Sequence, residues 1–253
     1  MLKKRIAPLL LWDEGRLVKT LSMRSPRVVG DPVRTCKVYS DQDADEIILL
    51  EIGRNESARP VFLESLRRIS SEIMMPVTVG GGVTSLDRAR LLFDSGADKV
   101  LVNSAAYSNT KLLEDISSNF GSQALVVAVD FERGDAETPR LYSESGSRLE
   151  SVTLLEHLRA VEGAGAGEIL IQSTERDGTR IGLDLEVIRQ TLEISSLPVV
   201  ACGGVGNFMH LLEAFELGVD GVGCGTLFNF GDNNPIRAKS YLRNHAIDLK
   251  RLG

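Results

Sequence analysis

A spacing of 122 positions recurs along this chain and limits the folds that it can adopt. The stretch Pro76–Val83 reads PVTVGGGV, and Pro198–Val205 reads PVVACGGV one spacing later. The same spacing separates matching residues at three places, namely Glu46 and Glu168, Gly81 and Gly203, and Gly96 and Gly218. A period of this length far exceeds a solenoid repeat, so it indicates a duplicated half-domain.

Short aliphatic runs alternate with amphipathic stretches through both halves. We expect strands at Arg5–Leu11, Glu46–Glu51, Val77–Val79, Lys99–Val102, Leu125–Asp130, Glu168–Gln172, Val199–Ala201 and Gly221–Cys224. We expect helices at Val61–Ile73, Leu86–Ser95, Leu112–Asn119, Leu154–Ala164, Leu185–Ile194 and Phe208–Leu217. Such alternation is typical of βαβ units in a parallel sheet.

Eight such units in a chain of 253 residues fit an α/β fold of the (β/α)8 TIM-barrel type. A doubly wound open sheet is the alternative, but the two-fold repeat favours a closed barrel. We therefore predict a single TIM-barrel domain over 1–253, with half-barrels of about 1–122 and 123–253. The polar stretch Glu132–Arg148 is expected to be a long loop after the fifth strand.

Charge and hydropathy exclude several classes of partner. The net charge is -6, which argues against nucleic acid and anionic membranes as principal partners. No apolar run approaches the ~20 residues that a membrane span needs, so we expect no membrane association. The short apolar stretch after the basic N-terminus is interpreted as the first strand rather than a signal peptide.

Cysteine and histidine usage points to a protein with reduced thiols and no metal. The three cysteines, Cys36, Cys202 and Cys224, are odd in number and form no CxxC pair, which is typical of a cytoplasmic protein. Cys202 and Cys224 are interpreted as packing residues, since no histidine is recognisably paired with either. The three histidines show no ligand spacing, so no metal site and no cofactor are expected.

Each half ends one strand in glycines and the next in small residues. We define the first phosphate grip as Gly81, Gly82, Asn103 and Ser104, and the second phosphate grip as Gly203, Gly204, Gly225 and Thr226. Glycine lets backbone N–H groups approach an anion closely, and a following helix start adds positive potential. The alternative is that these glycines only form tight turns. Two grips predict a phosphorylated small-molecule substrate with a phosphate at each end.

Several segments together resemble HisF, the cyclase subunit of imidazole glycerol phosphate synthase, over nearly the whole chain. The residues that carry the resemblance are Ala44–Glu51, Val79–Val83, Ala97–Ala105, Gly121–Asp130, Gly165–Thr179 with its Asp-Gly-Thr at 177–179, and Cys202–Gly206. The resemblance implies that a HisH-like glutaminase docks on the bottom of the barrel. Ammonia then crosses the barrel and closes an imidazole on a bis-phosphorylated substrate.

In that family two aspartates, at the ends of strands one and five, act as acid and base. Strand five ends in Asp130 as the pattern requires, but Leu11 stands at the position of the first aspartate. Leucine cannot exchange a proton, so the two-carboxylate cyclisation is expected to fail or to slow by about 10²–10⁴.

Asp130 is expected to act as an acid or base or, equally, to orient a ligand. Lys19 is expected to pair with a substrate phosphate or carboxylate, with a barrel-rim lysine as the alternative. We expect Gln172 to hydrogen-bond ammonia or substrate, and Asp177 and Gly178 to line the mouth.

Four charged residues stand at the N-terminal ends of predicted strands: Arg5, Glu46, Lys99 and Glu168. We call them the charged ring. The resemblance implies that they guard the ammonia entrance, and it places Asp98 at the glutaminase interface. The alternative is a self-neutralising plug of paired charges, which a protein interior tolerates.

Leu11 and its surroundings are most similar to a branch of HisF-like proteins, the WbuZ type, found with surface-polysaccharide genes. That likeness predicts that this chain delivers ammonia from a glutaminase to a sugar amidotransferase, which amidates a nucleotide-linked sugar. The first alternative is a working cyclase of histidine biosynthesis. The second alternative is a non-catalytic scaffold that binds a phosphorylated metabolite.

Overall fold

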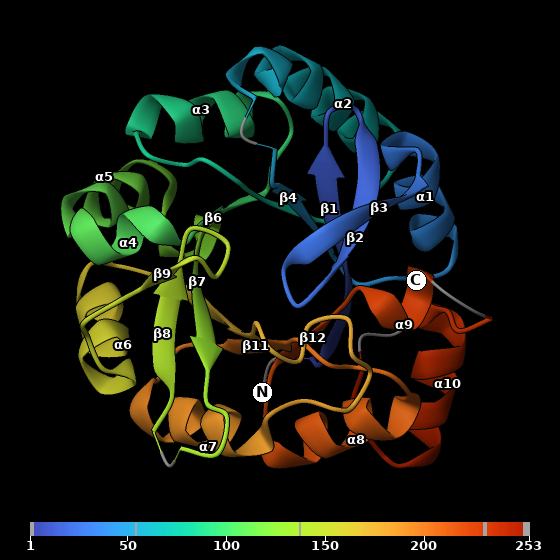
Figure 1. The fold of residues 1–253 in the computed structure, drawn as a ribbon. Helices are drawn as coiled ribbons and strands as arrows, with labels where there is room; N and C mark the ends of the chain where they lie inside the picture. Colours follow the sequence, from blue (N-terminus) through green and yellow to red (C-terminus); the bar gives the residue numbers. More distant parts are fainter. Residues whose placement is uncertain (1–2, 54, 137, 230–231, 250–253) are drawn as a thin grey trace.

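The computed structural model describes residues 3–53, 55–136, 138–229 and 232–249 (Figure 1). The terminal residues 1–2 and 250–253 of the predicted 1–253 domain lie outside the described residues. Eight parallel strands form a barrel: β1 (Arg5–Asp13), β4 (Ile47–Glu51), β5 (Val77–Gly80), β6 (Lys99–Val102), β7 (Leu125–Glu132), β10 (Glu168–Ser173), β11 (Val199–Cys202) and β12 (Gly221–Cys224). Each strand pairs with the next, and β12 pairs with β1 to close the sheet. The predicted (β/α)8 TIM barrel is confirmed.

Helices surround the barrel and pack on its outer face (Figure 1). They are α1 (Pro32–Asp41), α2 (Arg59–Glu72), α3 (Leu86–Asp94), α4 (Ser104–Ser108), α5 (Thr110–Phe120), α6 (Leu154–Gly163), α7 (Leu185–Ile194), α8 (Phe208–Leu217), α9 (Thr226–Asn229) and α10 (Pro235–Asn244). Short 3-10 turns lie at Glu56–Ala58 and Ser122–Ala124. The sequence patterns missed four helices: α1 and α10, and the short helices α4 and α9 that follow β6 and β12.

The 122-residue spacing is visible in local structure as well as in sequence. Asp98 and Asp220 each accept a hydrogen bond from the first backbone N–H of a neighbouring strand, at 2.8 Å for β5 and 3.0 Å for β11. Ser85 and Asn207 occupy the N-cap positions of α3 and α8, and each side chain accepts a backbone N–H of its helix. These side chains satisfy donors that would otherwise be unpaired, so the two halves begin equivalent strands and helices in the same way.

Two antiparallel extensions rise from the first and fifth barrel strands. After β1, the chain forms β2 (Arg16–Leu21) and β3 (Arg24–Gly30); after β7, it forms β8 (Arg140–Ser143) and β9 (Arg148–Leu149). The prediction that Glu132–Arg148 is only a loop was therefore wrong. The polar composition hid a hairpin whose tight turn has positive φ at Glu144, Ser145 and Gly146.

The barrel has two separate apolar layers because side chains alternate along each strand. The larger layer lies between the sheet and the helices. The smaller one fills the barrel interior and includes Ala7, Leu9, Leu11, Ile48, Leu101, Val126, Ala128, Leu170 and Val200. The interior is thus a packed hydrocarbon cluster, with the charged ring below it and the polar mouth above it. Among the described residues, no helix is long and apolar enough to cross a membrane.

Candidate functional site

Of the two strand ends where the HisF resemblance implies an aspartate, β7 carries Asp130 and β1 carries Leu11. Asp130 lies near the end of β7, where it pairs in register with Gln172 of β10. Leu11 lies near the end of β1, in register with Leu50 of β4, and belongs to the apolar interior cluster. The side chain of Leu11 is therefore part of the buried apolar interior and supplies no ionisable group.

The environment of Asp130 shifts its proton affinity toward neutrality. Burial raises the pKa of the carboxyl most strongly, a hydrogen bond from Asn103 lowers it, and the negative charge of Asp177 raises it. The net effect is a pKa of about 7, against an ordinary value of 3.8. Both protonation states are then populated near neutral pH, which is the condition for a general acid or base.

Lys19 lies in the mouth but is already paired. Its Nζ atom is 2.7 Å and 3.0 Å from the two carboxylate oxygens of Asp177, and the hydroxyl of Thr20 donates to the same carboxylate at 3.0 Å. Lys19 and Asp177 are both buried. The structure thus brings together residues predicted to bind substrate, and adds Thr20, which sequence reasoning missed because the partners are 157 positions apart.

Glycine is required at equivalent points of the two phosphate grips. Gly81 and Gly203 have φ values of +113° and +90°, where other residues are strained. A Cβ atom would lie 2.2 Å from the carbonyl oxygen of Glu51 at Gly81, and 2.4 Å from that of Ser173 at Gly203. At both positions the backbone passes too close to the end of the neighbouring strand to allow a side chain. A tight turn and an anion site would both need this close approach, so the glycines do not separate the two interpretations.

Each phosphate grip contains one of the buried side-chain atoms that lack a hydrogen-bond partner in the described part of the chain. Among the described residues, the Oδ1 atom of Asn103 and the Oγ1 atom of Thr226 are buried without a hydrogen-bond partner. Buried polar atoms are normally bonded, so such atoms mark places where a ligand or water completes the site. One lies in each phosphate grip. Lys19 packs against Gly225, where an added Cβ would be 3.1 Å from its Cε atom.

The other predicted mouth residues surround the same opening. Gly178 has φ of +78° and passes close to the backbone of Thr20. The Nε2 atom of Gln172 lies 3.9 Å from the sulfur of Met23, so its amide has no strong partner there. Ser104 accepts a backbone N–H from Glu144 at 3.0 Å, which ties the first phosphate grip to the β8–β9 turn.

The charged ring forms a closed cycle of ion pairs at the bottom of the barrel. Arg5 contacts Glu46 at 2.6 Å and also bonds Glu168; Lys99 contacts Glu46 at 3.1 Å and Glu168 at 2.7 Å. Burial raises the pKa of the Glu168 carboxyl, but its bonds to Arg5 and Lys99 outweigh burial and bring the pKa below its ordinary value. Each charge is thus balanced by two neighbours of opposite sign.

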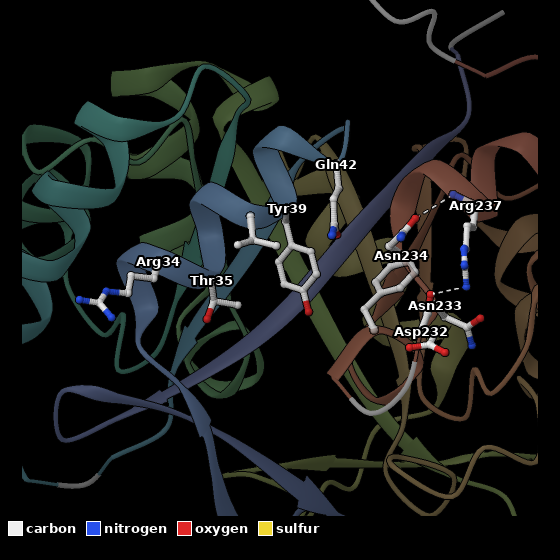
Figure 2. A pocket seen from close by; sticks show the side chains of 10 residues that line it. Arg34, Thr35, Tyr39, Gln42, Asp232, Asn233, Asn234 and Arg237 are labelled. Atoms are coloured by element: carbon white, nitrogen blue, oxygen red, sulfur yellow. Dashed lines mark hydrogen bonds between the residues drawn. The ribbon is translucent and has the colours of Figure 1, made fainter.

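Asp98 lies beside this ring, but its carboxylate is already bonded to the backbone N–H of Val77. A small cavity of about 280 Å³ nearby is lined by Asp98, Pro76 and the fully exposed Met74. A larger cavity of about 490 Å³ lies away from the mouth, between α1 and the loop that leads into α10 (Figure 2). Among the described residues, no group of three or more His, Cys, Asp or Glu could hold a metal ion.

Comparison with known proteins agrees with this architecture. The family model described as "Histidine biosynthesis protein" matches residues 5–234. Three relatives are each described as "Imidazole glycerol phosphate synthase subunit HisF". The protein from Exiguobacterium sibiricum is 38% identical over 250 residues, covering 99% of this chain and 100% of that protein. The protein from Thermotoga sp. (strain RQ2) is 39% identical over 253 residues, covering 100% of both. The protein from Chlorobium phaeobacteroides is 39% identical over 251 residues, covering 99% and 100%.

The matches run along almost the full length of this chain and of each relative, so they include both halves of the barrel. These matches identify the family of the chain, whereas its membership of the WbuZ-type branch stays a prediction. The chain belongs to the histidine biosynthesis protein family and, within it, to the HisF proteins.

Proposed function

We propose that this chain is a synthase subunit that takes ammonia from a HisH-like glutaminase and uses it in the barrel mouth on a substrate with a phosphate at each end. The observation that carries the proposal is the placement of Asp130 between two phosphate grips, at the end of the barrel opposite the charged ring. The names of the relatives favour imidazole glycerol phosphate synthesis in histidine biosynthesis as the activity.

In this proposal each part of the barrel has one task. The grips bind the two phosphates through backbone N–H groups and the free polar atoms of Asn103 and Thr226. Lys19 releases Asp177 and pairs with a substrate anion. Asp130 gives and takes the proton of the reacting group, because its pKa lies near neutrality. Opening of the charged ring admits ammonia to an apolar interior that offers charged species no partner.

Leu11 favours a second candidate, the amidation of a nucleotide-linked sugar by a third protein that receives the ammonia. With Leu11 at the end of β1, the mouth lacks one member of the acid–base pair that the HisF resemblance implies. Delivery of ammonia needs only the charged ring and the interior. The relatives' names give this candidate less support than histidine biosynthesis, so it stands on Leu11 alone.

Complementation separates the two candidates. The gene for this chain is expressed in a histidine auxotroph that lacks its cyclase subunit but retains its glutaminase. Growth supports the histidine role and removes the argument from Leu11. Absence of growth, together with stimulation of a co-purified glutaminase by this chain, supports ammonia delivery elsewhere. Phosphate binding with no effect on any glutaminase would instead indicate the non-catalytic scaffold.

A further inference from the structure

Three charged residues meet where the last helix, α10, packs against the residues that lead into β4. The Nζ atom of Lys239 lies 2.7 Å from the carboxylate of Asp45 and 2.9 Å from that of Asp43. The side chains of Lys239 and Asp45 are each only 1% exposed. We call these three residues the seam clasp. Replacing a buried ion pair by apolar residues of similar volume is often neutral or stabilising, so stability alone does not account for the seam clasp.

The other half of the barrel makes the matching junction from small uncharged residues. The 122-residue spacing relates each member of the seam clasp to one of them, namely Ser117 for Lys239, Gly165 for Asp43 and Gly167 for Asp45. Ser117 of α5 lies directly against Gly165, where an added Cβ atom would be 2.4 Å from the serine Oγ atom. Small side chains are therefore enough to pack a helix at this junction, and the half-barrel fold does not need the charges of the seam clasp.

Asp45 connects the seam clasp to the first strand of the barrel. Its Oδ1 atom accepts from Lys239, and its Oδ2 atom accepts the backbone N–H of Ile6 at 2.8 Å. The backbone N–H of Asp45 donates in turn to the carbonyl of Ile6 at 3.1 Å. At the matching junction Gly167 makes the backbone bond to Leu125 at 3.0 Å but has no side chain to make the second. One buried carboxylate thus joins α10, the start of β1 and the residues before β4.

Two members of the charged ring are the immediate chain neighbours of this contact. Arg5 directly precedes Ile6, and Glu46 directly follows Asp45. Successive side chains of an extended chain point to opposite faces, so Asp45 meets α10 while Glu46 meets the ring. The Nη1 atom of Arg5 lies 2.6 Å from the Glu46 carboxylate. The two bonds between Ile6 and Asp45 therefore fix the backbone from which this ion pair extends.

We propose that Lys239 and Asp45 are positioning residues for the charged ring. By holding the start of β1 against the residues before β4, they keep Arg5 in contact with Glu46. This inference rests on the proposed role of the ring in admitting ammonia. Because α10 lies on the outer face of the barrel, a displacement of that helix reaches the ring through the Asp45 carboxylate.

The test measures the interaction between Arg5 and Glu46 with the seam clasp intact and broken. A double-mutant cycle of Arg5→Met and Glu46→Gln, followed by urea unfolding of the isolated chain, gives the free energy of this interaction. In a Lys239→Met background the interaction is expected to fall by about half or more. Ile116→Ala is the control, because it is a buried change on α5, the helix that matches α10 in the other half. It is expected to lower stability and leave the interaction unchanged.

The comparison of these backgrounds decides the outcome. An interaction that is unchanged in Lys239→Met, or that falls equally in Ile116→Ala, would overturn the proposal. If Lys239→Met does not fold, Asp45→Asn provides the same measurement, since it keeps the shape of the side chain and weakens its bond to Lys239.

A second measurement separates the positioning role from the gate. In the complex with the co-purified glutaminase, free ammonium released per glutamine hydrolysed is expected to rise in Lys239→Met. The double-mutant cycle uses the isolated chain and needs no glutaminase. Loss of the interaction between Arg5 and Glu46 without a rise in free ammonium would therefore support the positioning role and refute the proposed gate instead.

Discussion

Replacing Leu11 by aspartate tests whether the mouth lacks one catalytic group. Leu11 is 6% exposed and packs in the interior cluster with Leu9 and Val18. Removing it from this cluster costs about 1.5–3 kcal/mol of apolar burial, and an unpaired polar group adds about 1–3 kcal/mol. We therefore expect Leu11→Asp to lower the free energy of unfolding by roughly 3–5 kcal/mol. In a protein of this size that corresponds to a fall in Tm of about 6–20 °C.

The same change is expected to accelerate the reaction. A second carboxyl opposite Asp130 restores the acid–base pair, and one positioned acid or base contributes about 10²–10⁴ in rate. The assay is formation of imidazole glycerol phosphate with ammonium salt as nitrogen source, which removes any dependence on a glutaminase. Leu11→Asn is the matched control, since it has nearly the same shape and polarity but exchanges no proton.

The comparison between the two variants decides the outcome. A large gain in Leu11→Asp with none in Leu11→Asn supports the missing-carboxyl argument. Equal rates in the two variants, with both folded by circular dichroism, would refute it. The unaltered chain turning over at the rate of a two-carboxylate enzyme would also show that Leu11 does not limit the chemistry.

Four further results are expected. The pKa of Asp130 is raised in the folded state, so its contribution to the free energy of unfolding is full below about pH 4 and is lost as the pH rises to about 7. The variant Asp130→Asn should remove this part of the pH dependence of Tm. Lys99→Met leaves Arg5 as the cation shared by Glu46 and Glu168, with Thr78 still bonded to Glu46. It should lower the urea-derived free energy of unfolding by about 1–3 kcal/mol and uncouple glutamine hydrolysis from ammonia use. Gly203→Ala places a Cβ 2.4 Å from a carbonyl oxygen and should weaken inorganic phosphate binding at least tenfold by calorimetry, on the order of 1.4 kcal/mol; Gly163→Ala, which meets nothing within 4 Å, is the control. Lys239→Met removes the buried cation that pairs with Asp43 and Asp45, and should lower the free energy of unfolding by about 3 kcal/mol at neutral pH. The loss should be smaller in acid, because Asp45 has a raised pKa and becomes protonated.

The 122-residue repeat predicted the barrel because the repeated residues lie at the strand ends, where close backbone approaches restrict which residues fit. Gly81 and Gly203 recur since each must pass a neighbouring strand without a side chain. The resemblance to HisF then placed Asp130 at the mouth and Leu11 at the position of the first aspartate. The division into half-barrels at about 122 and 123 stays a prediction, although caps and strand starts agree at the same spacing.

The missed elements are those whose stability comes from distant partners. Helix α10 buries Lys239, whose Nζ atom lies 2.7 Å from Asp45, 194 positions away. A lysine on the buried face breaks the apolar periodicity by which a helix is recognised. The pairing of Lys19 with Asp177 was equally hidden, because both residues were identified as substrate contacts and neither pattern shows that they neutralise each other.

Under the proposed function, the charges of the mouth determine the protonation state of Asp130 when substrate binds. Lys19 and Asp177 neutralise each other, which leaves Asp130 as the group whose charge changes near neutral pH. Bound phosphates bring further negative charge toward it, and a nearby negative charge raises the pKa of a carboxyl. Binding of the proposed substrate is thus expected to favour the protonated form, with Asp130 acting first as an acid. A second aspartate at position 11 would raise this pKa again, and the pair would share one proton. Under the proposed function, Leu11 is therefore expected to change the order of proton transfers as well as their number.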